Sequence, residues 1–107
     1  MITGYKGFIG SNLYKAVGGF GIDLKDGNDI RSCEIKDDGI IWHLAAQASI
    51  PKSFEDPIES NSHNVVGTLR VLEHARKTGA MVVFSSISSV YDPVSPYAVQ
   101  KHICEDY

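Results

Sequence analysis

Cysteine is scarce in this chain of 107 residues, which contains only Cys33 and Cys104. Their separation matches no metal-ligand spacing, and two cysteines make no disulfide framework, so we expect neither a metal site nor a disulfide-stapled domain. Ten Lys and Arg against 13 Asp and Glu give a net charge of −3, with no basic cluster. Because proteins that bind nucleic acid through its phosphates normally carry such a cluster, we expect no nucleic-acid partner.

Long hydrophobic runs are missing as well. No apolar run approaches the ~20 residues that cross a bilayer, and no charged segment followed by an apolar stretch opens the chain. We therefore expect a cytoplasmic protein without a membrane partner. The apolar content of 43% is nevertheless too high for a disordered chain. This length and composition predict a single globular domain over residues 1–107.

Short apolar runs alternate with helical patterns along the sequence. After a very short first strand, the pattern predicts strands at residues 20–24, 40–45 and 81–84, and a loop around Pro51. It predicts helices at residues 8–17, at 57–78 and from Pro96 onward. In the helix at 57–78, Asp56 can cap the start and Gly79 the end, and the apolar stripe contains Val65, Leu69, Leu72 and Ala75. Such alternation predicts an α/β fold with a parallel sheet of about four or five strands.

Ten glycines are the unusual feature, and three of them, Gly4, Gly7 and Gly10, are spaced as G-x-x-G-x-x-G between the first strand and the first helix. Glycines there permit a tight turn, close approach of the backbone to a pyrophosphate, and close packing of helix on strand. Asp23 ends the next strand, where an acidic side chain accepts hydrogen bonds from an adenine ribose. The pattern indicates a three-layer Rossmann-like domain that binds NAD. NADP is less favoured because Asp23 repels a 2′-phosphate, although Lys25 offsets part of that repulsion.

Together the motifs resemble the extended short-chain dehydrogenases/reductases, and among them the NAD-dependent sugar epimerase/dehydratase family, in particular its UDP-sugar 4-epimerase-like members. The resemblance covers residues 2–107. It rests on T-G-x-x-G-F-I-G at 3–10, D-I at 29–30, H-L-A-A at 43–46, N-V-V-G-T at 64–68, S-S-I-S-S-V-Y at 85–91 and S-P-Y-A-V-Q-K at 95–101. It implies a nucleotide-sugar or a similar alcohol as substrate. It also implies cofactor contacts by Thr3, Gly4, Gly7, Phe8, Ile9, Gly10, Asp23, Asp29, Ile30, Leu44, Ala45, Ala46, Gln47, Tyr97 and Lys101.

Tyr97 and Lys101 lie one helical turn apart, so their side chains project from the same face. An ammonium close to a phenol lowers the phenol's pKa and favours the phenolate. The resemblance implies that Tyr97 moves the hydroxyl proton of the substrate, while Lys101 lowers the pKa of Tyr97 and holds the nicotinamide ribose. Hydride then passes between the sugar carbon and the nicotinamide.

The sequence departs from the family pattern at three points. The family's catalytic serine or threonine falls on Ile87, which cannot donate a hydrogen bond, so Ser86 or Ser88 would have to serve. The loop between Tyr91 and Tyr97 is short, and the C-terminal half that holds the nucleotide-sugar in the family is not seen. Three functions stay open: an epimerase/dehydratase-like oxidoreductase, a dinucleotide-binding module without turnover, and a fragment of a longer epimerase.

The resemblance also predicts an assembly and several supporting residues. In the family, the helix that starts near Pro57 and the Y-x-x-x-K helix commonly pair across a dimer axis. We therefore expect a homodimer or larger homo-oligomer through residues 57–78 and 96–107. Asn64 is expected to hydrogen-bond the backbone of the neighbouring strand and so support the site, and His43 to be structural. The remaining histidines are expected at the surface: His63, His74 and His102.

Overall fold

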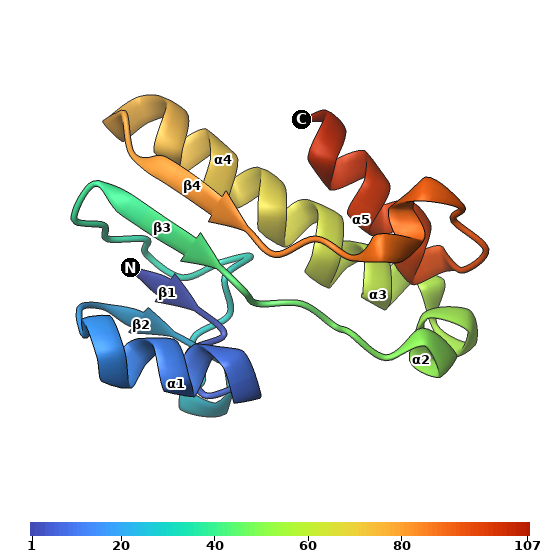
Figure 1. The fold of residues 1–107 in the computed structure, drawn as a ribbon, viewed down its shortest axis with the longest axis horizontal. Coiled ribbons are helices and arrows are strands. Elements are labelled where there is room, and N and C mark those ends of the chain that lie inside the picture. The colour runs from blue at the N-terminus through green and yellow to red at the C-terminus, as the bar shows by residue number, and fades with distance from the viewer.

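A four-stranded parallel sheet organises the chain, and the computed structural model describes all residues from 1 to 107. The strands are β1 (Ile2–Thr3), β2 (Gly21–Ile22), β3 (Ile40–His43) and β4 (Met81–Phe84), in the order β2-β1-β3-β4. Thr3 lies opposite Ile22 on one side and His43 on the other, and His43 lies opposite Phe84. The carboxyl ends of all four strands therefore meet at one edge of the sheet (Figure 1).

Five α-helices connect and follow the strands: α1 (Phe8–Val17), α2 (Ile50–Glu55), α3 (Pro57–Asn61), α4 (Gly67–Thr78) and α5 (Pro96–Asp106). A π-helical segment, Ser62–Val66, joins α3 to α4, and 3-10 turns occupy Leu24–Asp26 and Ser88–Tyr91. Asp56 caps α3 by accepting the Glu59 N–H at 3.0 Å, and Ser95 caps α5 by accepting the Ala98 N–H at 3.1 Å. Gly79, with φ of 78°, ends α4 in the left-handed conformation. None of the helices has the length and apolarity needed to cross a membrane.

The helices cover both faces of the sheet, with α1 on one face and α4 on the other (Figure 1). The strand order explains this, because β1 to β2 and β3 to β4 run toward opposite edges of the sheet, and right-handed crossovers then place their helices on opposite faces. The main core lies between the sheet and α4. Its buried members are Met1, Ile22, Ile30, Ile41, Val71 and Ala75.

The predicted order of strands and helices is confirmed, and so is the Rossmann-like parallel sheet with helices on both sides. The prediction of a loop around Pro51 is wrong, because residues 50–55 form α2. Ser49 caps that helix, and Pro51 stands in its first turn, where its missing N–H is not needed. The second strand is shorter than predicted, since the Asp23 carboxylate accepts the Lys25 N–H at 2.9 Å and a 3-10 turn starts there.

The apolar stripe predicted for residues 57–78 is partly wrong. Val65 and Ala75 are buried as expected, but Leu69 is 37% exposed, and Val71, outside the predicted stripe, is fully buried. The π-helical segment at 62–66 explains the difference. One extra residue in a turn rotates the following helix by about 100° relative to regular helical periodicity.

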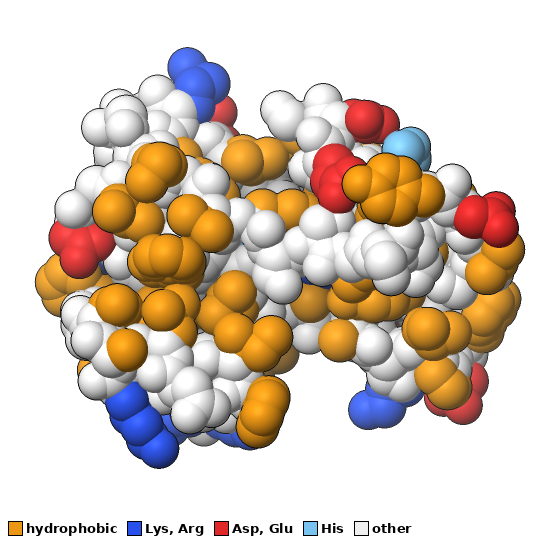
Figure 2. All heavy atoms as spheres, in the orientation of Figure 1, with side chains coloured by type: hydrophobic (Ala, Val, Ile, Leu, Met, Phe, Trp, Pro, Cys, Tyr) orange, Lys and Arg blue, Asp and Glu red, His pale blue; other side chains and the backbone are white.

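The face of the sheet that carries α1 is only partly covered. Ile40 and Met81 are 37% and 57% exposed. Alternation along the strands places both on the side opposite the core residues Ile41 and Val82. Figure 2 shows hydrophobic side chains gathered over β3 and β4 on the face turned toward the viewer.

Candidate functional site

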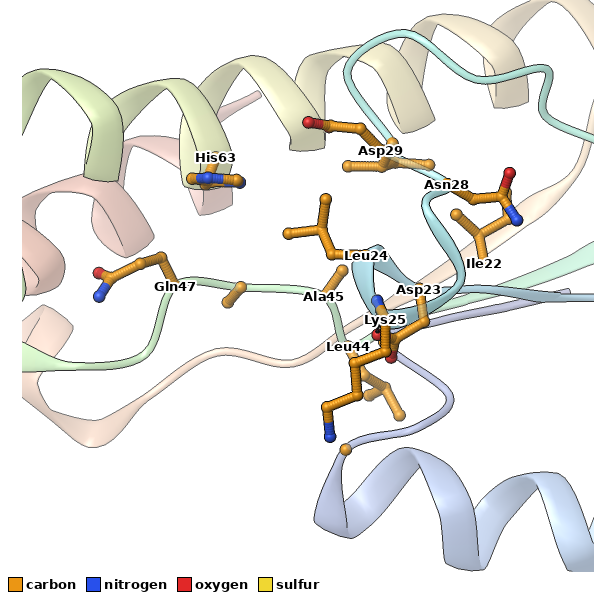
Figure 3. A pocket seen from close by; sticks show the side chains of 14 residues that line it. Ile22, Asp23, Leu24, Lys25, Asn28, Asp29, Leu44, Ala45, Gln47 and His63 are labelled. Carbon is orange, nitrogen blue, oxygen red and sulfur yellow. Dashed lines mark hydrogen bonds between the residues drawn. The ribbon is translucent and has the colours of Figure 1, made fainter.

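A pocket of about 320 Å³ opens at the carboxyl ends of β1, β2 and β3. It is lined by Gly4, Gly7, Ile22, Asp23, Leu24, Lys25, Asn28, Asp29, Ile30, Leu44, Ala45, Ala46, Gln47 and His63. Figure 3 shows it between the helical segment that carries His63 and the turn that carries Asp23 and Lys25. Open α/β sheets bind ligands at this place, because the direction of the strand order reverses between β1 and β3.

The glycine turn is pressed against the loop that follows β3. Gly4 has φ of 71°, and a Cβ on it would lie 2.9 Å from the Ala45 nitrogen. A Cβ on Gly10 would lie 2.2 Å from the Gly4 oxygen, so α1 can start this close to the turn only with glycine there. The Thr3 hydroxyl accepts the Ala45 N–H at 3.1 Å and holds the turn and the loop together. This cradle therefore requires glycines where the sequence has them.

The N-terminus of α1 offers free donors beside the cradle. Gly7 is its N-cap and has no side chain to cap it, and the backbone N–H groups of residues 8–10 have no acceptor within the chain. Free N–H groups and the positive end of the helix dipole together favour a bound anion such as a phosphate.

Asp23 is held in place by two backbone donors. One carboxylate oxygen accepts the Lys6 N–H and the other accepts the Lys25 N–H, each at 2.9 Å. The first of these bonds ties the end of β2 to the glycine turn. Because each carboxylate oxygen has two lone pairs, both retain the capacity to accept a hydrogen bond from a ligand diol.

A second acidic residue, Asp29, lies on the opposite wall of the pocket. Its carboxylate pairs with Arg31, with a shortest distance of 2.6 Å, and this guanidinium lowers the pKa of Asp29. Arg31 also donates to Glu59 at 3.0 Å and to Ser62 at 2.9 Å. These bonds fix the loop after β2 to the helical segment above the pocket.

His63, which is predicted at the surface, lines the pocket. It is half-buried, and its Nε2 lies 2.9 Å from a Glu59 oxygen. The π-helical segment that contains it turns it toward the pocket. The sequence signal that could have placed His63 in the pocket is its position directly before the N-V-V-G-T motif. The other lining residues absent from the predicted set are Ile22, Leu24, Lys25 and Asn28.

Several predicted cofactor residues do not line the pocket: Thr3, Phe8, Ile9, Gly10, Tyr97 and Lys101. Thr3 is fully buried behind the turn, whereas Phe8 and Ile9 are 89% and 62% exposed at the start of α1. Gly10 serves the packing of helix on turn described above. The pocket thus contains the glycine turn and the 44–47 loop, but not the Y-x-x-x-K helix.

The Y-x-x-x-K pair lies on α5 and is buried. Tyr97 is 7% exposed, and its N–H donates to the Ser53 hydroxyl at 3.3 Å. Lys101 is 3% exposed, and its ammonium donates to the Ser85 carbonyl at 2.8 Å. Burial raises the pKa of Tyr97 and lowers the pKa of Lys101. The expected lowering of the Tyr97 pKa by Lys101 is not found in this structure, because burial is the only cause that acts on this pKa and it raises it.

Of the two candidate serines that follow β4, only Ser86 makes a side-chain hydrogen bond. The Ser86 hydroxyl donates to the Glu105 carboxylate on α5, and Ser88 is exposed at the start of a 3-10 turn. Neither makes a hydrogen bond to Tyr97. Ile87 lies between them and is half-buried.

A buried polar network joins the pocket to α5. Asn64 accepts the Gln47 N–H at 2.8 Å and donates to the Gln100 side chain at 2.7 Å. Ser60 donates to the same Gln100 oxygen at 2.9 Å. The expected backbone partner of Asn64 in the neighbouring strand is wrong, since Asn64 bonds the Gln47 backbone in the loop that follows β3.

Residues 15–107 match the model of the NAD dependent epimerase/dehydratase family. The chain belongs to this family. It is 33% identical to the UDP-glucose 4-epimerase of Mycolicibacterium smegmatis, over 153 aligned positions that cover 100% of the chain and 49% of that relative. Because the alignment is longer than the chain, the relative carries internal segments that this family member does not have.

Solved structures give the same result. The UDP-N-acetylglucosamine 4-epimerase from Methanobrevibacter ruminantium M1, in complex with UDP-N-acetylmuramic acid, matches 99% of the chain with a TM-score of 0.88 and 28% identity. MoeE5, in complex with UDP-glucuronic acid and NAD, matches 98% with a TM-score of 0.86 and 29% identity. The chain covers 47% and 46% of these two structures, so it spans about half the length of its relatives.

Proposed function

We propose that this chain is one dinucleotide-binding unit of an epimerase/dehydratase and that its pocket binds NAD. The observation that carries the proposal is the glycine turn, where Gly4 lies too close to Ala45 for any side chain. A backbone that approaches its neighbour this closely leaves room for a pyrophosphate beside the free N–H groups of residues 8–10. NAD when bound supplies a hydride acceptor and donor.

Different lining residues bind different parts of the cofactor. The glycine turn and the start of α1 take the pyrophosphate, and the Asp23 carboxylate accepts hydrogen bonds from the adenine ribose. Asp29 and Ile30 form the wall beside the adenine. Asp23 favours NAD over NADP because it repels a 2′-phosphate.

In the catalytic form of this proposal, Tyr97 takes and returns the hydroxyl proton of a nucleotide-sugar or similar alcohol. Lys101 holds the nicotinamide ribose, for which its ammonium must exchange the Ser85 carbonyl for a ribose hydroxyl. Ser86 or Ser88 orients the substrate hydroxyl in place of the family's serine or threonine. The 4-epimerases matched above support this substrate class.

A second candidate is a dinucleotide-binding module without turnover. Lys101 is satisfied by Ser85, Tyr97 has a raised pKa, and Ile87 stands where the family has a hydroxyl. Each of these features favours binding without proton transfer.

Two measurements separate the candidates. Thermal unfolding with NAD and with NADP tests binding, and no stabilisation by either would contradict both. Nicotinamide absorbance with UDP-glucose and UDP-galactose, in wild type and Tyr97→Phe, tests turnover. Turnover that is lost in Tyr97→Phe supports the enzyme, equal turnover in both proteins removes Tyr97 from the mechanism, and NAD binding without turnover supports the module.

We also propose a homo-oligomer that forms through the helices of residues 57–78 and 96–107. Apolar side chains stand exposed on both segments: Ile58, Val66, Leu69, Val99 and Ile103. Burying such side chains in an isologous contact would remove them from water. Light scattering behind size exclusion at micromolar concentration tests this, and a strict monomer would contradict it.

A further inference from the structure

His43, at the end of β3, lies between Thr3, which precedes the glycine turn, and Thr68 on helix α4. It is 1% exposed, and both ring nitrogens have partners. Nδ1 lies 2.7 Å from the Thr3 hydroxyl on β1, and Nε2 lies 3.0 Å from the Thr68 hydroxyl on α4. None of these three side chains lines the pocket, and the family motifs place no catalytic or cofactor role on His43 or Thr68.

The hydrogen bonds around His43 have only one consistent direction. The Thr68 hydroxyl donates its single hydrogen to the Asn64 carbonyl at 2.6 Å, so toward His43 it can only accept. Nε2 must therefore carry a hydrogen. The unprotonated Nδ1 then accepts the hydrogen of Thr3, whose oxygen accepts the Ala45 N–H.

A second proton on the ring has no place in this arrangement. If Nδ1 also carried a hydrogen, the Thr3 hydroxyl would face two donors and its own hydrogen would have no acceptor, at a fully buried position. A positive ring would also lie near the Lys101 ammonium, since both groups contact the Phe84 ring: its centroid is 6.0 Å from that of His43 and 4.4 Å from the Lys101 ammonium. Desolvation, with a smaller effect from Lys101, accordingly lowers the pKa of His43 to about 4.

We infer that neutral His43, protonated on Nε2, is a positioning residue that fixes the glycine turn and the loop at Ala45 to helix α4. The bonds run in one direction, from the Ala45 N–H through Thr3, His43 and Thr68 to the Asn64 carbonyl. The Asn64 side chain in turn holds Gln47 and Gln100. This links the Gly4–Ala45 cradle to α5 through side chains that do not line the pocket. The consequence for NAD rests on the proposed function; the proton assignment does not.

Thr68 supplies a matched pair of variants. Thr68→Ser keeps the hydroxyl, whereas Thr68→Val has nearly the same shape but cannot accept the His43 hydrogen. In the full chain labelled with ¹⁵N, we expect the wild type and Thr68→Ser to show one histidine ring protonated on Nε2 that does not titrate between pH 8 and 5. We expect Thr68→Val to change that ring signal and to shift the amide signals of Gly4 and Ala45. NAD affinity should fall about 3- to 10-fold in Thr68→Val and stay within about twofold in Thr68→Ser, as the loss of one hydrogen bond implies.

The outcomes separate the two proposals. A wild-type His43 ring protonated on Nδ1, or titrating near pH 6.5, overturns the inference even if Thr68→Val does not fold. Unchanged Gly4 and Ala45 amide signals in a folded Thr68→Val overturn it as well. No NAD binding by the wild type contradicts the proposed function instead, and the ring and amide signals still decide the role of His43.

Discussion

The Lys101 ammonium donates a hydrogen bond to the Ser85 carbonyl at 2.8 Å. It also lies over the ring of Phe84, 4.4 Å from the ring centroid. The lysine that the family motif assigns to the cofactor is therefore already satisfied within the chain. It is buried at a cost, because desolvation lowers its pKa. The buried ammonium of Lys101 therefore disfavours the stability of the fold, although the proposed function requires it.

Replacing Lys101 with Met should separate the two. Lys101→Met removes a buried charge and keeps most of the volume, so we expect the melting temperature to stay unchanged or to rise. NAD-linked turnover, where the wild type has it, should be lost. Lys77→Met, at a side chain that is 64% exposed, is the control and should change neither quantity. A drop in the melting temperature of Lys101→Met as large as that of a core truncation would show that the ammonium stabilises the fold.

The stability of the protein should depend on pH through His43. The pKa of His43 is about 4 in the folded chain and about 6.5 when unfolded, so between these values the unfolded state binds more protons. The free energy of unfolding should therefore fall as the pH drops, by about 2 kcal/mol between pH 7 and pH 5 from this group alone. Urea unfolding at the two pH values measures it. His43→Gln cannot titrate and should lose that part of the dependence; an equal loss in both proteins would assign it to other groups.

The glycine turn can be tested with two glycines of similar conformation. Gly4 and Gly79 have φ of 71° and 78°, but a Cβ on Gly4 meets the Ala45 backbone, whereas a Cβ on Gly79 meets nothing within 4 Å. Both alanine variants should lose about 1 kcal/mol of stability from the left-handed backbone. Only Gly4→Ala should also lose NAD binding, by at least about tenfold, because its Cβ pushes the turn away from Ala45. Calorimetric titration measures the NAD affinity of both variants. Comparable affinities would show that the glycine turn does not take part in NAD binding.

Asp26 should restrain the use of NADP. It pairs with Lys6 and accepts the Tyr5 hydroxyl at 2.6 Å, and Lys6 is also the residue whose N–H holds Asp23. Asp26→Asn frees the Lys6 charge beside Asp23, so we expect NADP to bind a few-fold more tightly relative to NAD, a small effect because solvent screens an exposed charge. Asp106→Asn changes the same charge on the distant end of α5 and should leave the ratio unchanged. An equal shift of the NADP-to-NAD ratio in both variants would show that it comes from the change in net charge alone.

Local sequence signals were sufficient where a feature depends on neighbours in the chain. The glycine spacing predicted the turn at residues 4–10, and the Asp56 and Gly79 caps predicted where the long helical segment begins and ends. The apolar run at 81–84 predicted β4 with its bounds. In each case the signal is a backbone requirement of the residue itself.

The same signals were insufficient where the outcome depended on distant contacts. No periodicity marks the π-helical segment at 62–66, which turned Val71 into the core and His63 toward the pocket. The spacing of Tyr97 and Lys101 predicted a shared helix face. It could not show that both side chains are buried, which raises the pKa of Tyr97 and lowers that of Lys101.

The sequence by itself determined the alternation of strands and helices, the glycine turn and the family, because these follow from backbone conformation and local pattern. Only the tertiary structure decided which side chains share protons and charge. His43 and Thr68 are 25 residues apart, and Lys101 and Ser85 are 16 apart. Whether such groups bond to each other depends on how the sheet and helices pack and on how much water that packing removes.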